Sequence, residues 1–146
     1  RHTLSTLFGY GCLPVVNEND TVSVAEIKFG DNDHLAAMVA NLLQAPLLVL
    51  LTNVGGLFSA DPRENPAARL VETVPFIDRA VTELAGATKS SLGTGGMRSK
   101  LRAARLATAA GGAVVMANGS TDGVLDDIFA GKPVGTLFLP HGHALP

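Results

Sequence analysis

Three short clusters in the sequence contain residue types that bind charged groups. Two are rich in carboxylates and side-chain amides, NEND at residues 17–20 and GDND at residues 30–33. The third is the glycine-rich run GTGGMRSK at residues 93–100. Carboxylates and amides can hold an ammonium group or a metal ion, whereas free backbone amides at the start of a helix can hold an anion. These clusters are therefore the first candidates for a functional site.

Each acidic cluster allows two interpretations. Asp31, Asn32 and Asp33 directly precede an amphipathic helix and could provide its N-cap, but one cap accounts for only one of the three residues. The alternative is a charged site that holds lysine ammonium groups, a metal ion or an ammonium ligand. Residues 17–20 are either a solvated hairpin or an acidic pocket for a substrate amino group. Because the two clusters are close in the sequence, they can face one cavity.

The glycine-rich run directly precedes a predicted helix, so its amides and the helix dipole favour an anion. It does not match the Walker A pattern. It does not match the GxGxxG fingerprint either, because Arg98 takes the place of the last glycine. Arg98, Arg102 and Arg105 share one helix face, which indicates solvated surface. Lys100 lies roughly 140–160° from them, nearer the apolar face. An inward lysine either binds a partner, such as a nucleotide phosphate, or extends along the helix to solvent.

A fourth motif, TNVGGLF at residues 52–58, follows an apolar run and is followed by ADPR at residues 60–63. It is either a plain loop over the sheet or the floor of an adenine or ribose pocket. The four histidines have no pattern of supporting ligands, so no transition-metal site is predicted. Cys12 is the single cysteine, which excludes a disulfide framework and a cysteine zinc site.

Short apolar runs that alternate with helical patterns predict the elements that must position these clusters. Runs of strand length without polar alternation are typical of strands buried on both faces of a parallel sheet. They are residues 13–16, 47–51 and 113–117, with a weaker candidate at 21–27. Helices are expected at residues 3–8, 35–43, 77–84 and 97–110 and after Gly123. This alternation indicates an α/β fold with right-handed crossovers, in which ligands bind beyond the carboxyl ends of the strands.

The 146 residues suffice for one domain with its own core, and they carry a net charge of −2. That charge argues against a broad nucleic-acid-binding surface. No apolar run reaches the ~18 residues of a membrane helix, so no membrane association is expected. With no signal-peptide pattern, the default expectation is a cytoplasmic protein.

Together, the motifs resemble those of the amino acid kinase family, and most closely its members that phosphorylate glutamate. Four segments between Pro14 and Phe138 carry the resemblance: PVVNENDTVSVAEIKFGDNDHLAAMVA, LLTNVGGLFSADPRENPAA, SLGTGGMRSKLRAA and GTLF. The resemblance implies a three-layer α/β/α sandwich with a mainly parallel sheet, incomplete at its N-terminus. It assigns residues 1–139 to the C-terminal part of an amino acid kinase domain and residues 140–146 to a tail or linker.

The resemblance also implies an activity, the transfer of a phosphoryl group from ATP to the side-chain carboxylate of L-glutamate. The product would be γ-glutamyl phosphate, the first intermediate of proline synthesis. Asp20 and Asn32 match positions that bind glutamate, whereas Asp33 matches the aspartate that orders the catalytic lysines, so Asp33 and Lys100 are the predicted catalytic residues. The positions that match ATP contacts are Thr52, Asn53, Thr94, Gly95, Gly96, Met97, Arg98, Ser99 and Lys100. Mg²⁺ is expected on the nucleotide, and the complete enzyme is expected to be a homo-oligomer.

Two departures from the family pattern qualify these expectations. Asn53 stands where the family usually has aspartate, which keeps the hydrogen-bonding shape and removes the charge. The family's first strand, with its glycine-rich turn and phosphate-binding lysine, precedes the region present here, so we expect inefficient catalysis by this chain alone. A non-catalytic nucleotide-binding module and a kinase for another amino acid are the alternative functions.

Overall fold

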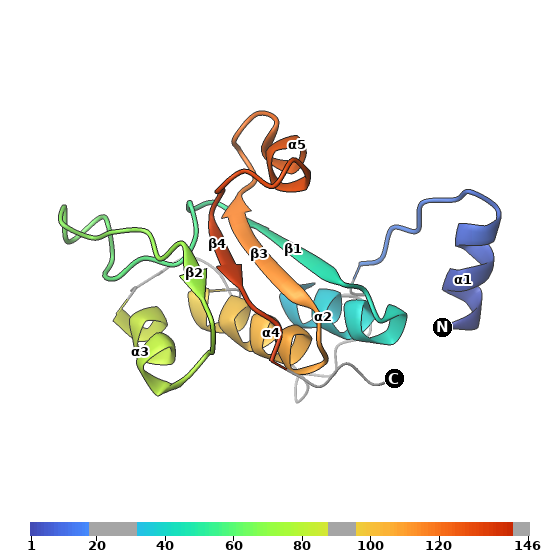
Figure 1. Ribbon diagram of the computed structural model, residues 1–146, viewed down its shortest axis with the longest axis horizontal. Coiled ribbons are helices and arrows are strands. Elements are labelled where there is room, and N and C mark those ends of the chain that lie inside the picture. Colours follow the sequence, from blue (N-terminus) through green and yellow to red (C-terminus); the bar gives the residue numbers. More distant parts are fainter. Residues whose placement is uncertain (18–31, 88–95, 142–146) are drawn as a thin grey trace.

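The computed structural model describes residues 1–17, 32–87 and 96–141 of the chain. Helices and strands alternate one by one over residues 97–138, whereas two helices or two strands follow one another earlier in the chain (Figure 1). The helices are α1 (His2–Gly9), α2 (Asn32–Leu43), α3 (Arg79–Ala87), α4 (Met97–Ala109) and α5 (Val124–Phe129). The strands are β1 (Leu47–Thr52), β2 (Thr73–Val74), β3 (Ala113–Asn118) and β4 (Thr136–Phe138). The five predicted helices are confirmed, and so are the strands predicted at 47–51 and 113–117.

The four strands form one sheet in the order β1-β3-β4-β2. β1 runs parallel to β3, with Leu47 opposite Ala113 and Thr52 opposite Asn118. β2 and β4 are also parallel, whereas β3 and β4 are antiparallel. The expectation of a mainly parallel sheet is therefore confirmed. The sequence analysis did not predict β2 and β4, which are only two and three residues long.

Helices α2, α3 and α4 lie on one side of the sheet (Figure 1). Their apolar residues join Leu50, Met116 and Phe138 in the larger of two hydrophobic clusters. α4 contributes most to this cluster among the helices, through Leu101 and three alanines. Small residues on α4 let the helix approach the sheet closely, and the larger strand side chains fill the layer between them.

The opposite face of the sheet carries a smaller cluster, in which Val115 and Ala117 of β3 pack with Val124 of α5. Side chains of a strand alternate between faces, so β3 contributes to both clusters and is covered on both sides. Helices therefore cover both faces of the sheet, as the predicted three-layer α/β/α sandwich requires.

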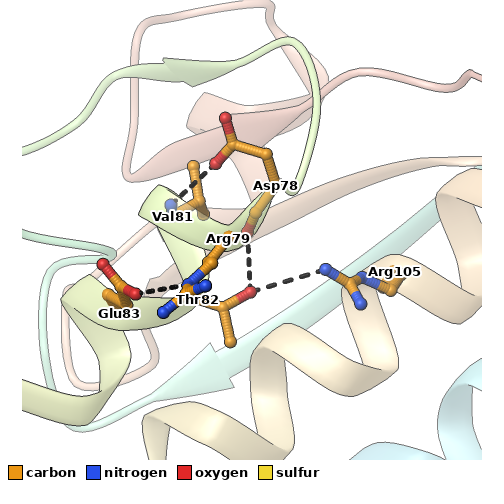
Figure 2. A network of polar contacts seen from close by, with 6 residues as sticks. All are labelled: Asp78, Arg79, Val81, Thr82, Glu83 and Arg105. Carbon is orange, nitrogen blue, oxygen red and sulfur yellow. Dashed lines mark hydrogen bonds and ion pairs between the residues drawn. The ribbon is translucent and has the colours of Figure 1, made fainter.

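Polar contacts set the start of α3 and attach it to α4 (Figure 2). The Asp78 carboxylate accepts a 2.9 Å hydrogen bond from the amide of Val81, which makes Asp78 an N-cap. This cap explains why the helix begins at Arg79 rather than at Ile77, where the sequence pattern starts. Arg105 of α4 donates to the carbonyl of Ile77 at 2.7 Å and to the Thr82 hydroxyl at 3.4 Å.

The strand predicted at residues 13–16 is wrong. These residues form no strand in the structure, and Leu13, Val15 and Val16 are 86%, 91% and 50% exposed. An apolar run becomes a strand only when another strand supplies hydrogen bonds beside it, and none does so among the described residues. The weaker strand predicted at 21–27 lies outside the described residues.

The two ends of the chain differ in how closely they pack. α1 buries none of its side chains, and a 3.2 Å hydrogen bond from Arg1 to Gln44 connects it to the turn after α2. Pro140 and His141 lie in no helix or strand, and residues 142–146 lie outside the described part of the predicted tail. Among the described residues, no helix has the length and apolar character needed to span a membrane.

Candidate active site

The candidate site lies at the carboxyl ends of β1 and β3. Each of these strands directly follows a helix, α2 before β1 and α4 before β3, through a short turn. Each helix therefore runs antiparallel to the strand that follows it, and its N-terminus lies at the strand's carboxyl end. This topology brings the start of α2, the start of α4 and the residues after both strands to one edge of the sheet, where open α/β sheets bind ligands.

α2 and α4 pack side by side and run in the same direction. At their N-terminal ends Asp33 contacts Lys100, and further along Asn41 donates a 3.2 Å hydrogen bond to the carbonyl of Leu106. Early residues of one helix contact early residues of the other, and later residues contact later ones, so the two helices are parallel. Their dipoles therefore point the same way, and the positive ends of both meet beside the Asp33–Lys100 pair.

Asp33 and Lys100 form the central ion pair of the candidate site. The ammonium nitrogen of Lys100 lies 2.9 Å from one carboxylate oxygen of Asp33 and 3.1 Å from the other. Each side chain is only 15% exposed. Such shielding from water strengthens the attraction, and the two bonds fix the position of the ammonium group. The sequence analysis left open whether Lys100 has a partner or extends to solvent, and the structure shows the partner.

The first turn of α4 combines features that favour an anion. Gly96 precedes the helix in an extended conformation, with no side-chain cap among the described residues. This turn contains no acidic residue, but it contains Arg98 and Lys100, which the helix dipole alone would disfavour. Ser99 is 2% exposed, and its hydroxyl oxygen has no hydrogen-bond partner within the described part of the chain. An anion at this end would accept bonds from the free amides and neutralise the positive charge.

Polar side chains follow both strands at this edge. Thr52 ends β1, and its hydroxyl lies 3.4 Å from the amide oxygen of the exposed Asn53. Asn118 ends β3 opposite Thr52, and its side chain accepts a 2.9 Å bond from the amide of Ser120. The Gly119 amide donates to the carbonyl of Thr52 at 2.9 Å, which joins the two strand ends. The sequence analysis assigned no role to the polar residues that follow β3.

Asp61 orders a turn within the loop after β1. Its carboxylate is buried and accepts three bonds from Arg63, one from the backbone amide and two from the guanidinium group, at 2.7–3.0 Å. These hydrogen bonds hold the pKa of Asp61 below its ordinary value, and the bonds from the guanidinium group have the largest effect. The loop is also attached to β4, because the Thr136 hydroxyl accepts a 2.9 Å bond from the amide of Leu57. The Asp61 carboxylate thus shapes the turn at residues 61–63, and the Leu57–Thr136 bond attaches the loop to the sheet.

The structure describes some of the remaining predicted site residues and not others. Asn32 begins α2 and is exposed beside Asp33. Met97 and Arg98 lie in the first turn of α4, whereas Asp20, Thr94 and Gly95 lie outside the described residues. Across residues 1–17, 32–87 and 96–141, no group of three or more His, Cys, Asp or Glu side chains could hold a metal ion. The described part of the site therefore offers a cation, Lys100, that Asp33 holds at the N-terminal end of α4.

Curated relatives are similar over almost the whole chain. It is 53% identical to the glutamate 5-kinase of Geobacter metallireducens over 145 residues, which are 99% of this chain and 39% of the relative. It is also 53% identical to the glutamate 5-kinase of Sodalis glossinidius over 146 residues, 100% of this chain and again 39% of the relative. The chain thus spans about two fifths of the length of these relatives.

Solved structures share the fold. The isopentenyl phosphate kinase of T. acidophilum aligns with a TM-score of 0.52 and 25% identity over 73% of this chain and 38% of that one. The UMP kinase of Bacillus anthracis aligns with a TM-score of 0.53 and 19% identity over 75% of this chain and 41% of that one. The sequence model of the amino acid kinase family matches residues 1–118. By this match, the chain belongs to the amino acid kinase family.

Proposed function

We propose that this chain provides the ATP-binding part of a glutamate 5-kinase. The reaction is transfer of the γ-phosphoryl group of MgATP to the side-chain carboxylate of L-glutamate, which yields γ-glutamyl phosphate for proline synthesis. The observation that carries the proposal is the shielded Asp33–Lys100 ion pair at the joined N-terminal ends of α2 and α4. It stands in a chain 53% identical to glutamate 5-kinases.

The chemistry of this transfer suits the site. The acceptor carboxylate is already ionised at neutral pH and needs no strong general base. The difficulty is that two anions must meet, so the protein has to position them and cancel their repulsion. A lysine fixed by an aspartate supplies positive charge without reorganisation, and Mg²⁺ bound to the nucleotide supplies more.

Within this proposal each site residue has one task. Lys100 contacts the nucleotide phosphates, and Asp33 is a positioning residue that holds Lys100. The residues from Thr94 to Ser99 surround the phosphates with backbone amides and the Ser99 hydroxyl, while Thr52 and Asn53 contact the rest of the nucleotide. Asp20 and Asn32 bind glutamate. Each role is carried over from the family motif to the matching position of this sequence.

A chimera tests the proposal directly. The 146 residues would replace the matching segment of the Geobacter metallireducens relative, and glutamate-dependent release of ADP would be measured. We expect the chimera to turn over glutamate and Lys100→Ala to lower kcat/KM by about 10²–10³-fold, the usual effect of removing one group that stabilises transition-state charge. Arg102→Ala is the matched control, because this exposed cation lies on the same helix outside the site, and it should retain activity.

Three outcomes would contradict the proposal. A folded chimera that binds ATP without glutamate-dependent turnover would indicate a nucleotide-binding module. Turnover with aspartate or acetylglutamate in place of glutamate would indicate a kinase for another amino acid. Equal losses for Lys100→Ala and Arg102→Ala would remove the specific role of Lys100.

A further inference from the structure

The sides of α2 and α4 that face each other carry polar contacts near both ends. Asp33, Ala37 and Asn41 are spaced by four residues, so they share one face of α2. Asp33 binds Lys100 near the start of both helices, and Asn41 donates a 3.2 Å hydrogen bond to the carbonyl of Leu106 toward their ends. One polar contact thus joins the two helices near each end of their interface.

The apolar packing between these contacts does little to fix the position of one helix along the other. Ala37 of α2 and Ala103 and Ala104 of α4 are fully buried in the larger hydrophobic cluster. The hydrophobic effect has no direction, and a methyl side chain forms only a low ridge on a helix surface. A hydrogen bond, in contrast, requires a narrow range of distances and angles. The register of α2 along α4 therefore depends on the polar contacts.

The bond from Asn41 is directed at a carbonyl that the end of α4 leaves available. Leu106 is among the last four residues of α4, whose carbonyls lie beyond the regular ladder of helical hydrogen bonds. The amide of Ala110, four residues further on, donates to the carbonyl of Ala107. Because the Asn41–Leu106 bond is partly buried, removal of the Asn41 donor would expose the Leu106 carbonyl to a loss that water replaces incompletely.

We propose that Asn41 is a positioning residue for Lys100. Asn41 lies eight residues after Asp33, which is about 12 Å along the same helix, so a slide of α2 at one end moves the other end equally. The Asn41–Leu106 bond holds the register in which both carboxylate oxygens of Asp33 lie 2.9–3.1 Å from the ammonium nitrogen of Lys100. A slide of about 1 Å would lengthen these bonds or move the ammonium group. The proposal rests on the proposed function for the task of Lys100 at the nucleotide phosphates.

The chemical reactivity of Lys100 tests the proposal without nucleotide or glutamate. The 146-residue chain would be treated with a trace of acetic anhydride, and acetylation of each lysine would be followed by mass spectrometry. We expect Asn41→Leu to raise the acetylation rate of Lys100 about threefold or more, because Asp33 then holds the ammonium group less firmly. Lys132 is the internal control, since its side chain is 62% exposed and bonds to Asp127, and its rate should stay the same.

Thr108→Val is the matched control for a general loss of stability. It removes a buried hydrogen bond to the carbonyl of Ala104 that lies within α4 and does not involve α2. Asn41→Leu and Thr108→Val should both lower the free energy of unfolding, because each removes one hydrogen bond. Only Asn41→Leu should change the acetylation rate of Lys100, since only that variant frees α2 to slide along α4.

A double-mutant cycle in the chimera tests whether Asn41 acts through Lys100. We expect Asn41→Leu to lower kcat/KM for glutamate about tenfold, the scale of effect that a small misplacement of a charged group has. In the Lys100→Ala background the same substitution should change kcat/KM by less than about twofold, because the group that it positions is already absent. A residue that only stabilised the fold would give the same factor in both backgrounds.

Three results would overturn the proposal. They are an unchanged acetylation rate of Lys100 in Asn41→Leu, equal effects of Asn41→Leu and Thr108→Val on that rate, and equal losses of kcat/KM from Asn41→Leu with and without Lys100. A chimera without glutamate-dependent turnover would contradict the proposed function instead. The acetylation rates would still decide whether Asn41 positions Lys100, so the two proposals fail separately.

Discussion

The hydroxyl of Ser99 is buried in the first turn of α4 without a partner among the described residues. An unsatisfied buried polar group costs about 1–3 kcal/mol of stability, so natural structures contain few of them. Thr108 on the same helix shows the usual arrangement, because its buried hydroxyl donates to the carbonyl of Ala104 at 2.9 Å. A nucleotide phosphate would give Ser99 the acceptor that the described chain does not.

Substitution of Ser99 should therefore have opposite effects on the stability of the chain and on its binding of MgATP. We expect Ser99→Ala to raise the free energy of unfolding of the ligand-free chain by about 1 kcal/mol and to weaken MgATP binding. Thr108→Val is the control, and it should lower stability by about 1 kcal/mol without changing binding. Urea unfolding and calorimetric titration give the two quantities. A Ser99→Ala chain that is less stable, or that binds MgATP as tightly as the parent, would contradict this account.

Asp61 makes the stability of the loop after β1 depend on acid. Because the hydrogen bonds from Arg63 lower its pKa below the ordinary value of 3.8, the ionised form is favoured in the folded chain. Its contribution is complete above that ordinary value and is lost as the pH falls through the lowered pKa of the folded state. We expect Asp61→Asn to be less stable than the parent near neutral pH, with a difference that shrinks below about pH 4. Urea unfolding across this range measures it, and a constant difference would contradict the prediction.

Residue types alone predicted part of the site. The helical position of Lys100 indicated an inward lysine that either binds a partner or extends to solvent, and the structure supplies Asp33 as the partner from a helix far away in the sequence. The unpartnered hydroxyl of Ser99 could not be predicted in the same way, because its state depends on which groups the fold brings within 3.5 Å. The sequence around Asp61 indicated a loop but not that its carboxylate is buried, because this burial depends on how the loop folds around it.

At the scale of elements, Gly135 decides how closely the turn before β4 approaches β3. Its φ is +68°, and a side-chain carbon there would overlap the carbonyl oxygen of Met116. Gly131 has a similar φ of +73° but open space around it. Substitutions at the two glycines therefore distinguish two costs in stability, that of a left-handed backbone for a residue with a side chain and that of the close approach to β3.

We expect Gly131→Ala to lower the free energy of unfolding by about 1 kcal/mol, the usual cost of a left-handed conformation for a residue with a side chain. Gly135→Ala should lose about 3 kcal/mol or more, because the backbone of β3 must also shift. Thermal or urea unfolding of the two variants checks the difference. Equal losses would mean that the turn moves away from β3 at little cost.

The elements that the sequence predicted best are those with a strong pattern over enough residues. The apolar runs of β1 and β3 span six residues each, and the amphipathic stripes of α2 and α4 span helices of 12 and 13 residues, so each pattern is long enough to be recognised. β2 and β4 are too short to show a period. Residues 13–16 have the composition of a strand, but composition does not specify whether another strand is present to pair with it.

At the scale of the whole molecule, burial is uneven. The larger hydrophobic cluster lies between the sheet and the layer of α2, α3 and α4, whereas the opposite face has a small cluster under α5. Large apolar side chains outside both clusters are exposed, including Leu51 on β1 and Leu125 and Phe129 on α5. Exposed apolar surface of this kind is common at sites that contact another polypeptide.

The strand order β1-β3-β4-β2 has a consequence for the route by which the chain folds. β3 and β4 are neighbours along the chain, whereas β1 must close a much longer loop to reach β3, and such closure carries a larger entropic cost. We therefore expect β3, α5 and β4 to form the folding nucleus, with β1 and β2 added on either side afterwards. In stopped-flow experiments Val115→Ala in β3 should mainly slow folding, whereas Val74→Ala in β2 should mainly speed unfolding. The reverse assignment would place the nucleus at the edge of the sheet.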